Sequence, residues 1–426
     1  MSFNRMSFNR ICVLGLGYIG LPTATLLASR QLPVFGVDVN PHVVESINRG
    51  HTHIAEPGLA QAVQAAVAQG YLQAGSQPVS AQAFLIAVPT PLKADHQPDV
   101  SFVEAAALSL APVLKPGDLI ILESTSPVGT TEQMAGWLAQ ARPDLSFPQQ
   151  AGEASDIRIA YCPERVLPGR IMEELLSHER VIGGMTPRCS ARASELYRLF
   201  LLEGDCTMTD SRTAEMCKLT ENSFRDVNIA FANELSLICA EQQIDVWALI
   251  RLANRHPRVT ILQPGPGVGG HCIAVDPWFI VAQHPQQARL IRTAREVNDA
   301  KPRWVVEQVK ITVAEALAQG NQRAGDLRIA CLGLAFKPDV EDLRESPALA
   351  IAGQIAAWHA GTTWVVEPHI RRLPPGLQEK AALVDIERAL SEADILVLLV
   401  DHRQFRAIAP EQVAQRWVVD TKGVWR

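Results

Sequence analysis

Short apolar runs alternate with stretches of helical periodicity along the first half of the chain. Runs with the length of a buried strand stand at residues 11–14, 34–37, 83–88, 118–122 and 158–161. Between them, apolar residues recur with helical spacing up to Leu27, over 103–113 and over 130–141. Buried strands that alternate with helices predict a doubly wound parallel sheet.

The pattern changes near Asp210 and changes back after Ala318. Helical periodicity without strands continues over 214–242, 246–253 and 289–298. A further, long amphipathic helix is expected from Pro302 to Ala318. Strand-like runs then return at 327–332, 363–366 and 395–400. We therefore predict an α/β protein in which two Rossmann-like domains, each with a doubly wound parallel sheet, are joined by a central helical domain with a long connecting helix.

These changes of pattern give the expected domain boundaries. We place a first α/β domain at residues 11–209, the helical domain at 210–301, and a second α/β domain with the connecting helix at 302–426. Residues 1–10 repeat the pentapeptide Met-Ser-Phe-Asn-Arg. We expect this leader to be disordered or artefactual and to lie outside the fold.

Composition excludes several classes of partner. The 426 residues carry a net charge of -6 without clustered Lys and Arg, so nucleic acid is not an expected partner. The 8 cysteines include no Cys-x-x-Cys pair, and His51 and His53 have no third ligand nearby, so we expect no disulfide framework and no metal. No apolar run approaches the roughly 18 residues of a membrane span. We therefore expect a cytoplasmic protein.

The first strand runs into a glycine turn that is typical of dinucleotide binding. Gly15, Gly17 and Gly20 form a G-x-G-x-x-G pattern with Tyr18 and Ile19 between a predicted strand and a predicted helix. Asp38 ends the second strand, where its carboxylate can accept hydrogen bonds from ribose hydroxyls and would repel a 2′-phosphate. The sequence therefore predicts NAD rather than NADP.

Two later loops also follow predicted strands directly. One contains Pro89 and Thr90, and the other contains Ser124 and Thr125. Open α/β sheets bind ligands at this edge, but prolines and glycines also make rigid connections. Both interpretations stay open on the residues alone.

A glycine and proline tract over 264–270 ends on His271 and Cys272 and runs into a segment with helical character, 273–281. A helix start stabilises a thiolate, and lowering a thiol pKa from near 8.5 by about 1.5 units half-ionises it at pH 7. Cys272 is thus a candidate nucleophile, although a buried structural cysteine is the alternative. Asp276, one helical turn later, is a candidate base for a water or a first-turn residue favoured by the helix dipole.

Three more polar residues are candidates for the chemistry. Lys218 and Asn222 are four residues apart on a predicted helix, where a cation and an amide can stabilise a developing alkoxide. A solvated helix face explains the same spacing. Glu164 follows a strand in a proline-bounded loop and is a candidate acid or base.

In this order the motifs resemble the UDP-glucose/GDP-mannose dehydrogenase family over essentially the whole chain after the leader. The similar segments are Gly15-Leu-Gly-Tyr-Ile-Gly20, Glu123-Ser-Thr125, Pro163-Glu164, Lys218 with Asn222, Gly267-Val-Gly-Gly-His-Cys272, Phe336-Lys337 and Asp342-Leu-Arg344-Glu-Ser346. The resemblance implies that two NAD oxidise the C6 alcohol of a UDP-sugar to a carboxylate through an aldehyde and a thioester on Cys272. It also implies a homodimer that forms through the helical middle.

The resemblance assigns roles to these positions. The catalytic residues would be Cys272, Lys218, Asn222, Glu164, Asp276 and Thr125. Cofactor contacts would come from Gly15, Gly17, Tyr18, Ile19, Gly20, Asp38, Pro89, Thr90, Ser124 and Thr125. Substrate contacts would come from Glu164, Arg165, Val166, Leu167, Lys218, Asn222, Arg258, Gly269, Phe336, Lys337 and Arg344.

Two departures from the family pattern bear on the sugar. Members that act on UDP-glucose commonly have Phe-Gly-Gly-Ser-Cys followed by a Lys-Asp pair, whereas Cys272 here follows Val-Gly-Gly-His and Asp276 follows Val275. Those members also continue Pro-Glu with Phe-Leu-Arg-Glu, whereas Glu164 is followed by Arg-Val-Leu-Pro-Gly. The first departure argues against UDP-glucose, and the second resembles the branch that oxidises N-acetylhexosamines. No single residue separates the manno from the gluco epimer.

Two other functions stay open on the residues. A two-electron dehydrogenase of the hydroxy-acid type would use Lys218 and Asn222 for one hydride transfer and leave Cys272 structural. A nucleotide-sugar sensor would bind NAD without chemistry, although the co-occurrence of Cys272, Lys218 and Glu164 argues against it.

Overall fold

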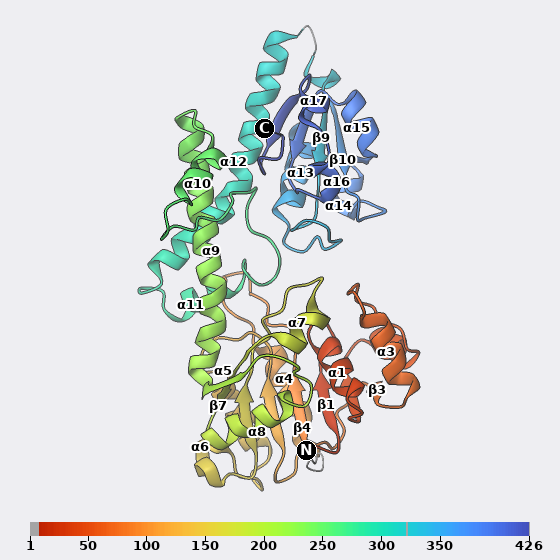
Figure 1. Cartoon of the computed structure of the whole chain (residues 1–426), viewed down its shortest axis with the longest axis vertical. Coiled ribbons are helices and arrows are strands. Elements are labelled where there is room, and N and C mark those ends of the chain that lie inside the picture. The colour runs from red at the N-terminus through yellow and green to blue at the C-terminus, as the bar shows by residue number, and fades with distance from the viewer. Residues whose placement is uncertain (1–7, 321–322, 426) are drawn as a thin grey trace. The chain divides into compact units, whose positions relative to one another are not determined.

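The computed structural model describes residues 8–320 and 323–425 and divides into two compact units, one ending at Glu221 and the other beginning at Asn222. Helix α9 (Ser211–Glu241) starts in the first unit and continues in the second (Figure 1). The first seven residues of the expected leader lie outside the described residues. Phe8 belonged to that leader in our prediction, yet its side chain is 1% exposed and packs into the core of the first unit.

The first unit is built on a sheet with the strand order β3-β2-β1-β4-β5-β6-β7-β8. Its strands are β1 (Ile11–Leu14), β2 (Val34–Val37), β3 (Leu72–Gly75), β4 (Ala83–Ile86), β5 (Leu119–Leu122), β6 (Arg158–Tyr161), β7 (Arg180–Gly184) and β8 (Cys206–Asp210). Its helices are α1 (Gly20–Ser29), α2 (Pro41–Asn48), α3 (Leu59–Ala68), α4 (Ser101–Leu110), α5 (Thr130–Ala141), α6 (Pro148–Ala151), α7 (Ile171–Ser177) and α8 (Pro187–Tyr197).

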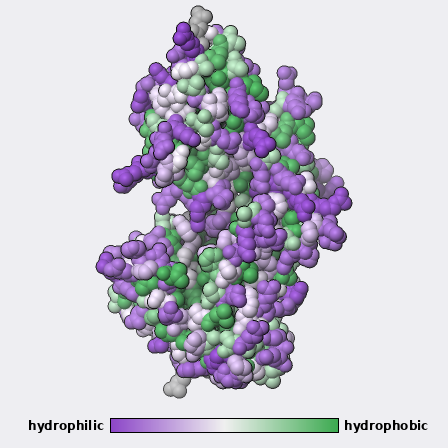
Figure 2. All heavy atoms as spheres, turned by 180° about the vertical axis from the view of Figure 1, so that it is seen from behind, coloured by the Kyte–Doolittle hydropathy of each residue, from purple (hydrophilic) through white to green (hydrophobic). Residues whose placement is uncertain are grey.

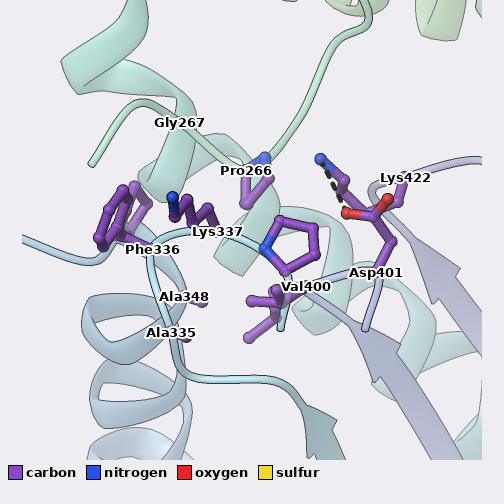
Figure 3. A pocket seen from close by; sticks show the side chains of 12 residues that line it. Pro266, Gly267, Ala335, Phe336, Lys337, Ala348, Val400, Asp401 and Lys422 are labelled. Carbon is purple, nitrogen blue, oxygen red and sulfur yellow. Dashed lines mark ion pairs between the residues drawn. The ribbon is translucent and has the colours of Figure 1, made fainter. Parts of the chain in front are cut away.

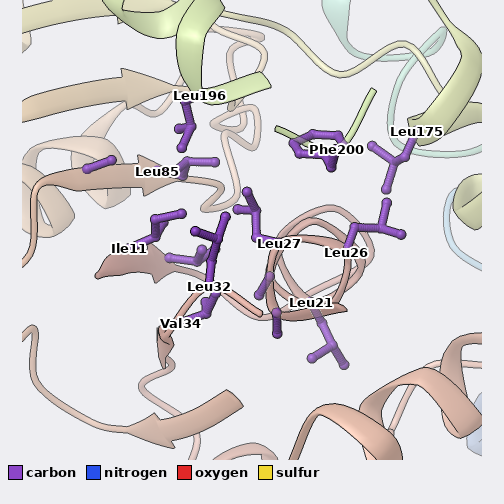
Figure 4. Close-up of a cluster of buried hydrophobic side chains, with 14 of the residues drawn as sticks. Ile11, Leu21, Leu26, Leu27, Leu32, Val34, Leu85, Leu175, Leu196 and Phe200 are labelled. Carbon is purple, nitrogen blue, oxygen red and sulfur yellow. The ribbon is translucent and has the colours of Figure 1, made fainter. Parts of the chain in front are cut away.

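The central strands are apolar at every position because helices cover both faces of the sheet. On one face, side chains from β1, β2 and β4 pack against α1, α7 and α8 (Figure 4). All five predicted strands are confirmed, and the predicted helix over 130–141 is α5. We did not predict β3, β7 or β8, and β7 differs from the expected parallel sheet because it pairs with β6 in the antiparallel sense.

The second unit contains the helical segment and a second sheet. Its helices after α9 are α10 (Val246–Ala253), α11 (Asp276–Gln283), α12 (Arg289–Gln319), α13 (Pro347–Trp358), α14 (Pro375–Gln378), α15 (Ile386–Glu392), α16 (Arg403–Arg406) and α17 (Pro410–Val413). Its strands are β9 (Arg328–Leu332), β10 (Thr362–Val366), β11 (Ala382–Leu383), β12 (Ile395–Leu398) and β13 (Trp417–Asp420). All are parallel in the order β11-β10-β9-β12-β13, which repeats the order β3-β2-β1-β4-β5 of the first sheet.

Helix α12 corrects one prediction. We expected two helices separated at Pro302, but α12 continues through this proline, and the predicted boundary at residue 301 falls inside it. Buried polar contacts hold α12 against α9 on the near side of the proline. Arg295 pairs with Asp226 at 2.7 Å, and the Asn298 side chain accepts a hydrogen bond from Asn233 at 2.9 Å. These tertiary contacts outweigh the local cost of a proline inside a helix.

Within the described residues, no helix combines the length and the apolar character that crossing a bilayer requires. Apolar side chains are scattered among hydrophilic ones on the face shown in Figure 2.

Candidate active site

The turn between β1 and α1 leaves one glycine accessible from outside. Gly15 has φ of +86°, and a Cβ on Gly20 would lie 1.8 Å from the carbonyl oxygen of Gly15. A Cβ on Gly17 would meet no atom within 4 Å. The fold therefore requires glycine at positions 15 and 20, whereas the open space at Gly17 suits a ligand that approaches the backbone. Tyr18 and Ile19 complete the turn, and α1 begins at Gly20.

Asp38 is fixed beside this turn. Its Oδ2 accepts a hydrogen bond from the Leu16 NH at 3.0 Å, and its Oδ1 accepts one from the Asn40 NH at 2.9 Å. Each carboxylate oxygen keeps a second lone pair, so the contacts are compatible with the predicted role toward ribose hydroxyls.

The loops after β4 and β5 are tied to each other. The Thr90 hydroxyl donates to the carbonyl oxygen of Thr125 at 2.6 Å, and the Ser124 hydroxyl donates to that of Val88 at 2.7 Å. Pro89 lies between the two contacts in the sequence. Because β1, β4, β5 and β6 are parallel neighbours, these loops end at the same edge of the sheet as the glycine turn. That edge is where open α/β sheets bind ligands.

Glu164 follows β6 at the same edge and is buried. Its Oε2 forms an ion pair with Arg180 Nη1 at 2.6 Å, and its Oε1 accepts a hydrogen bond from the Arg165 NH at 2.6 Å. Among the other predicted substrate residues of this loop, Val166 packs on the core and Leu167 is 53% exposed. The loop thus presents one fixed carboxylate and one exposed apolar side chain.

Glu123 and Tyr197 form a second buried polar pair near Glu164. The Tyr197 hydroxyl donates to Glu123 Oε1 at 2.6 Å. Burial raises the pKa of Glu123 to about 7, which the Tyr197 hydrogen bond offsets only in part. Burial likewise raises the pKa of the Cys162 thiol to about 12.

Helix α9 carries Lys218 and is anchored one turn earlier. Glu215 is fully buried and accepts hydrogen bonds from the Gly129 NH at 2.6 Å and the Thr131 NH at 2.8 Å, at the start of α5. Lys218 is half-buried, and its Nζ has no hydrogen-bond or ion-pair partner among residues 8–320 and 323–425. A fixed backbone with an uncommitted cation suits the predicted oxyanion role.

In the second unit, Asn222 and Asp276 lie together. The Asn222 amide donates to the Asp276 carboxylate, and both side chains are buried. The Asp276 NH donates to the carbonyl oxygen of Cys272 at 2.8 Å. Cys272 is exposed, whereas six of the other cysteines are buried and Cys217 is half-buried. The exposed thiol therefore lies one turn from a carboxylate that an amide holds in place.

The helix start differs from our prediction. We expected the helix to begin at Ile273, directly after the thiol, but α11 begins at Asp276, and Cys272 lies in the preceding turn. Pro277 fixes this later start, because proline favours the first turn of a helix. Lost hydration and the positive charge of Arg344 lower the pKa of the neighbouring His271.

The glycine tract packs against the loop that follows β9. A Cβ on Gly269 would lie 2.6 Å from the carbonyl oxygen of Glu345, and one on Gly270 would lie 2.9 Å from the ring of Phe336. The Gly270 NH donates to the carbonyl oxygen of Arg344 at 3.3 Å. The structure thus brings together Gly269, Phe336 and Arg344, three predicted substrate residues.

A pocket opens beside this contact (Figure 3). Pro266 and Gly267, residues 335–338, Pro347 and Ala348, residues 399–401 and Lys422 line it. It lies at the carboxyl ends of β9 and β12, neighbours whose connections leave toward opposite sides of the sheet, which is where doubly wound folds bind nucleotides. Lys337 lines this pocket and extends toward Phe336, with its Nζ 5.8 Å from the centre of that ring, and Lys422 Nζ pairs with Asp401 Oδ1 at 3.4 Å.

A buried histidine, His402, connects two acidic residues next to this pocket. Glu367 Oε2 accepts hydrogen bonds from the backbone NH groups of Leu334 and Ala335 and lies 3.1 Å from His402 Nε2. His402 Nδ1 accepts the Asp339 NH at 2.9 Å. Asp339, His369 and His402 are close enough together to suggest a metal cluster, but both ring nitrogens of His402 already have protein partners.

Some predicted substrate residues lie elsewhere or have other partners. Arg258 is exposed on the segment after α10 and is not among the residues that line the pocket. Arg344 pairs with Asp342 at 2.6 Å on its own loop, and Arg165 pairs with Glu221 of α9 at 2.6 Å.

The sequence interpretation missed Arg180, Glu215, Asp401 and Lys422. One signal was available, because Glu215, Asn222, Asp226 and Asn233 recur at spacings of seven, four and seven and form a buried polar stripe along α9. Arg180 had no such signal, because its role depends on the antiparallel pairing of β7.

Comparison with known proteins matches the chain in three successive segments. Successive segments match the UDP-glucose/GDP-mannose dehydrogenase family: its NAD binding domain over residues 9–201, its central domain over 212–300 and its UDP binding domain over 330–426. A UDP-N-acetyl-D-mannosamine dehydrogenase from Yersinia pestis is 70% identical over 421 residues, which cover 99% of this chain and 100% of that protein.

Two further relatives extend the comparison. An NDP-N-acetyl-D-galactosaminuronic acid dehydrogenase from Ralstonia nicotianae is 61% identical over 420 residues, which cover 99% of this chain and 97% of that protein. The solved structure of a UDP-D-ManNAc dehydrogenase from Pyrococcus horikoshii has a TM-score of 0.87 at 36% identity and covers 98% of this chain and 96% of that chain.

The glycine turn generates a prediction about cofactor binding. Gly17→Ala should fold normally but weaken NADH binding at least tenfold, because the added methyl group occupies the open space. Fluorescence titration measures the affinity, and circular dichroism reports the fold. Gly136→Ala on α5, where a Cβ also meets no atom within 4 Å, is the matched control and should bind NADH normally. Unchanged affinity in Gly17→Ala would contradict the predicted pyrophosphate approach.

Glu123 generates a prediction about pH. A carboxyl group whose pKa rises from 4.5 to about 7 on folding binds its proton more tightly in the native state, so stability falls as pH rises through this window. At pH 8 the free energy of unfolding of Glu123→Gln should therefore exceed that of the wild type by up to about 3 kcal/mol. At pH 4 the difference should be small. Urea titrations at both pH values measure this, and a gain that is equal at both would refute it.

Proposed function

The chain belongs to the UDP-glucose/GDP-mannose dehydrogenase family, and from this premise we propose that it oxidises UDP-N-acetyl-D-mannosamine to UDP-N-acetyl-D-mannosaminuronate. Members of this family are NAD-dependent oxidoreductases that act on nucleotide sugars. The observation that carries the proposal is the exposed thiol of Cys272, one turn from an Asp276 carboxylate that Asn222 holds in place.

The proposed reaction proceeds in two oxidations at the same carbon. When bound, NAD would supply the hydride acceptor for each oxidation of C6, so two NAD would be consumed per sugar. After the first, the Cys272 sulfur adds to the aldehyde carbon, and the hydride lost in the second leaves a thioester. Water then attacks the thioester carbonyl, and the C–S bond breaks to release the carboxylate and the free thiol. Each addition places negative charge on the C6 oxygen.

The chain's own residues have separate tasks in this scheme. Lys218 and Asn222 donate to the C6 oxyanion, and the uncommitted Nζ of Lys218 suits this task. Glu164 and Asp276 accept protons from the C6 alcohol and from the attacking water. Thr125 positions that water. Gly17 and Asp38 bind the pyrophosphate and the ribose of NAD.

The sugar is proposed from two independent lines. The segments around Cys272 and Glu164 depart from the UDP-glucose pattern, and the 70% identical relative is a UDP-N-acetyl-D-mannosamine dehydrogenase. The 61% identical relative acts in the galacto series, so epimer choice varies among similar chains. No single residue separates the manno from the gluco epimer, so UDP-N-acetyl-D-glucosamine is the alternative substrate to be tested.

We assign the diphosphate to the pocket at the ends of β9 and β12. All of its lining residues except Pro266 and Gly267 belong to the segment that matches the UDP binding domain, and Lys337 and Lys422 are among them. Lysine is a common phosphate ligand because its ammonium is a compact charge with three donors. Gly269 packs against Phe336, one of the residues that line the pocket.

We also propose a homodimer that forms through α9. Phe224, Phe231 and Ile238 are spaced by seven residues, which keeps them on one face of the helix, and they are 68%, 50% and 50% exposed. Large apolar side chains aligned in this way mark an interface rather than a solvated surface.

The proposed substrate and reaction order are tested together by NADH yield. UDP-N-acetyl-D-mannosamine, UDP-N-acetyl-D-glucosamine, UDP-N-acetyl-D-galactosamine and UDP-glucose are each supplied in limiting amount with excess NAD. We expect two NADH per UDP-N-acetyl-D-mannosamine, measured by absorbance at the end point, and slower or no oxidation of the others. One NADH per sugar would instead support the two-electron dehydrogenase, and no turnover would support the sensor.

Cysteine variants are the control for that measurement. Cys272→Ser should lower kcat at least a hundredfold while NADH still binds, whereas Cys217→Ser, the half-buried thiol on α9, should retain activity. Full activity in Cys272→Ser would exclude the thioester.

The α9 stripe predicts the oligomeric state. The wild type should have the mass of two chains in light scattering, and Phe224→Asp with Phe231→Asp should have the mass of one, because two buried charges oppose association. Ile311→Asp changes a residue on α12 that is 51% exposed and should leave the mass unchanged. A monomeric wild type, or a double variant that stays dimeric, would refute this interface.

A further inference from the structure

The antiparallel strand β7 brings an arginine to Glu164. Tyr161 pairs with Gly183 across the β6–β7 ladder. Because the strands are antiparallel, moving three residues forward from Tyr161 and three back from Gly183 brings Glu164 opposite Arg180. A parallel β7 would have placed Arg180 at the opposite edge of the sheet. The one departure from the expected topology thus generates a contact at the proposed active site.

The contact leaves Glu164 little freedom. The Arg180 and Glu164 side chains are 3% and 5% exposed, and Arg180 Nη1 lies 2.6 Å from Glu164 Oε2. The other Arg180 terminal nitrogen donates to the carbonyl oxygen of Leu175 at 3.3 Å. Glu164 Oε1 accepts the Arg165 NH, so both carboxylate oxygens are held. A planar guanidinium with separate donors fixes orientation in a way that a single ammonium cannot.

The surrounding groups make this pairing specific. Burial raises the pKa values of Cys162 and Tyr197, which keeps both neutral, and it raises that of Glu123. The Arg180 guanidinium also lies 5.2 Å from the centre of the Tyr197 ring. Among the residues that the structure describes, Glu164 is the carboxylate within ion-pair distance of Arg180. Replacing a buried ion pair with apolar residues is often neutral or stabilising, so stability alone does not account for this pair.

We infer that Arg180 is a positioning residue, which orients the Glu164 carboxylate for proton transfer during the oxidation. The inference rests on the proposed function, in which Glu164 is one of two carboxylates that handle protons. Arg165 adds a second constraint, because its ion pair with Glu221 attaches the same loop to α9 one turn after Lys218. The loop that carries Glu164 is thus held by two ion pairs, one to β7 and one to α9. Together they restrict the orientation of the Glu164 carboxylate.

A double-mutant cycle tests this inference. Arg180→Lys keeps the charge but loses the planar guanidinium with its separate donors. We therefore expect kcat to fall at least tenfold while the KM for NAD stays within twofold. In a Glu164→Gln background, where no carboxylate remains to be oriented, the same substitution should change kcat less than twofold. Arg158→Lys replaces the buried arginine that begins β6, at the opposite edge of the sheet, and should leave kcat unchanged in both backgrounds.

Folding is followed separately. Thermal unfolding and NADH binding are measured for each variant, and Glu164→Gln with Arg180→Met removes both charges so that neither is left buried alone. An equal fall in kcat in both backgrounds would show that Arg180 acts independently of Glu164 and would overturn the inference. Wild-type kcat in Glu164→Gln would also overturn it, whereas the NADH yield tests the proposed reaction without reference to either residue.

Discussion

The placement of Lys218 depends most on the buried carboxylate of Glu215. This carboxylate accepts hydrogen bonds from the backbone of Gly129 and from both the backbone and the hydroxyl of Thr131. These NH groups belong to the start of α5, and the first NH groups of a helix have no hydrogen-bond partner within the helix. One residue therefore caps α5 and anchors α9, and Lys218 follows one turn later.

The two sheets share one architecture, but only one of them leaves its acid accessible. Gly15 and Gly333 both have positive φ after the first strand of their sheet, and the next backbone NH donates to an acid that follows the second strand, Asp38 or Glu367. Asp38 is half-buried and free to accept further bonds. Glu367 is fully buried against His402, so its carboxylate is not accessible to a ligand. The pocket of the second sheet accordingly lies beside its neighbouring strand β12.

The extent of sequence prediction follows from the range of each interaction. Apolar runs and glycine spacing are local, so the central strands, the turn at Gly15 and the motif ending at Cys272 could be predicted. The continuity of α12 through Pro302 and the placement of Arg180 depend on tertiary contacts, and no local pattern reports them. The start of α11 lies between these cases, because Pro277 signals it but residues 273–275 also have helical character in the sequence. Assignment of the thioester needed the family resemblance, since spacing only made Cys272 a candidate.

The central claim is that Cys272 holds the sugar covalently between two oxidations. Asp276→Asn should slow release of the acid, so the enzyme mixed with NAD and UDP-N-acetyl-D-mannosamine and quenched in acid should accumulate the acyl-enzyme. Peptide mass spectrometry should then find the Cys272 peptide heavier by the sugar acyl group, and find no such adduct in Cys272→Ser. A contradicting result would be a wild type that forms the uronic acid while neither it nor Asp276→Asn shows an adduct on this peptide at any quenching time.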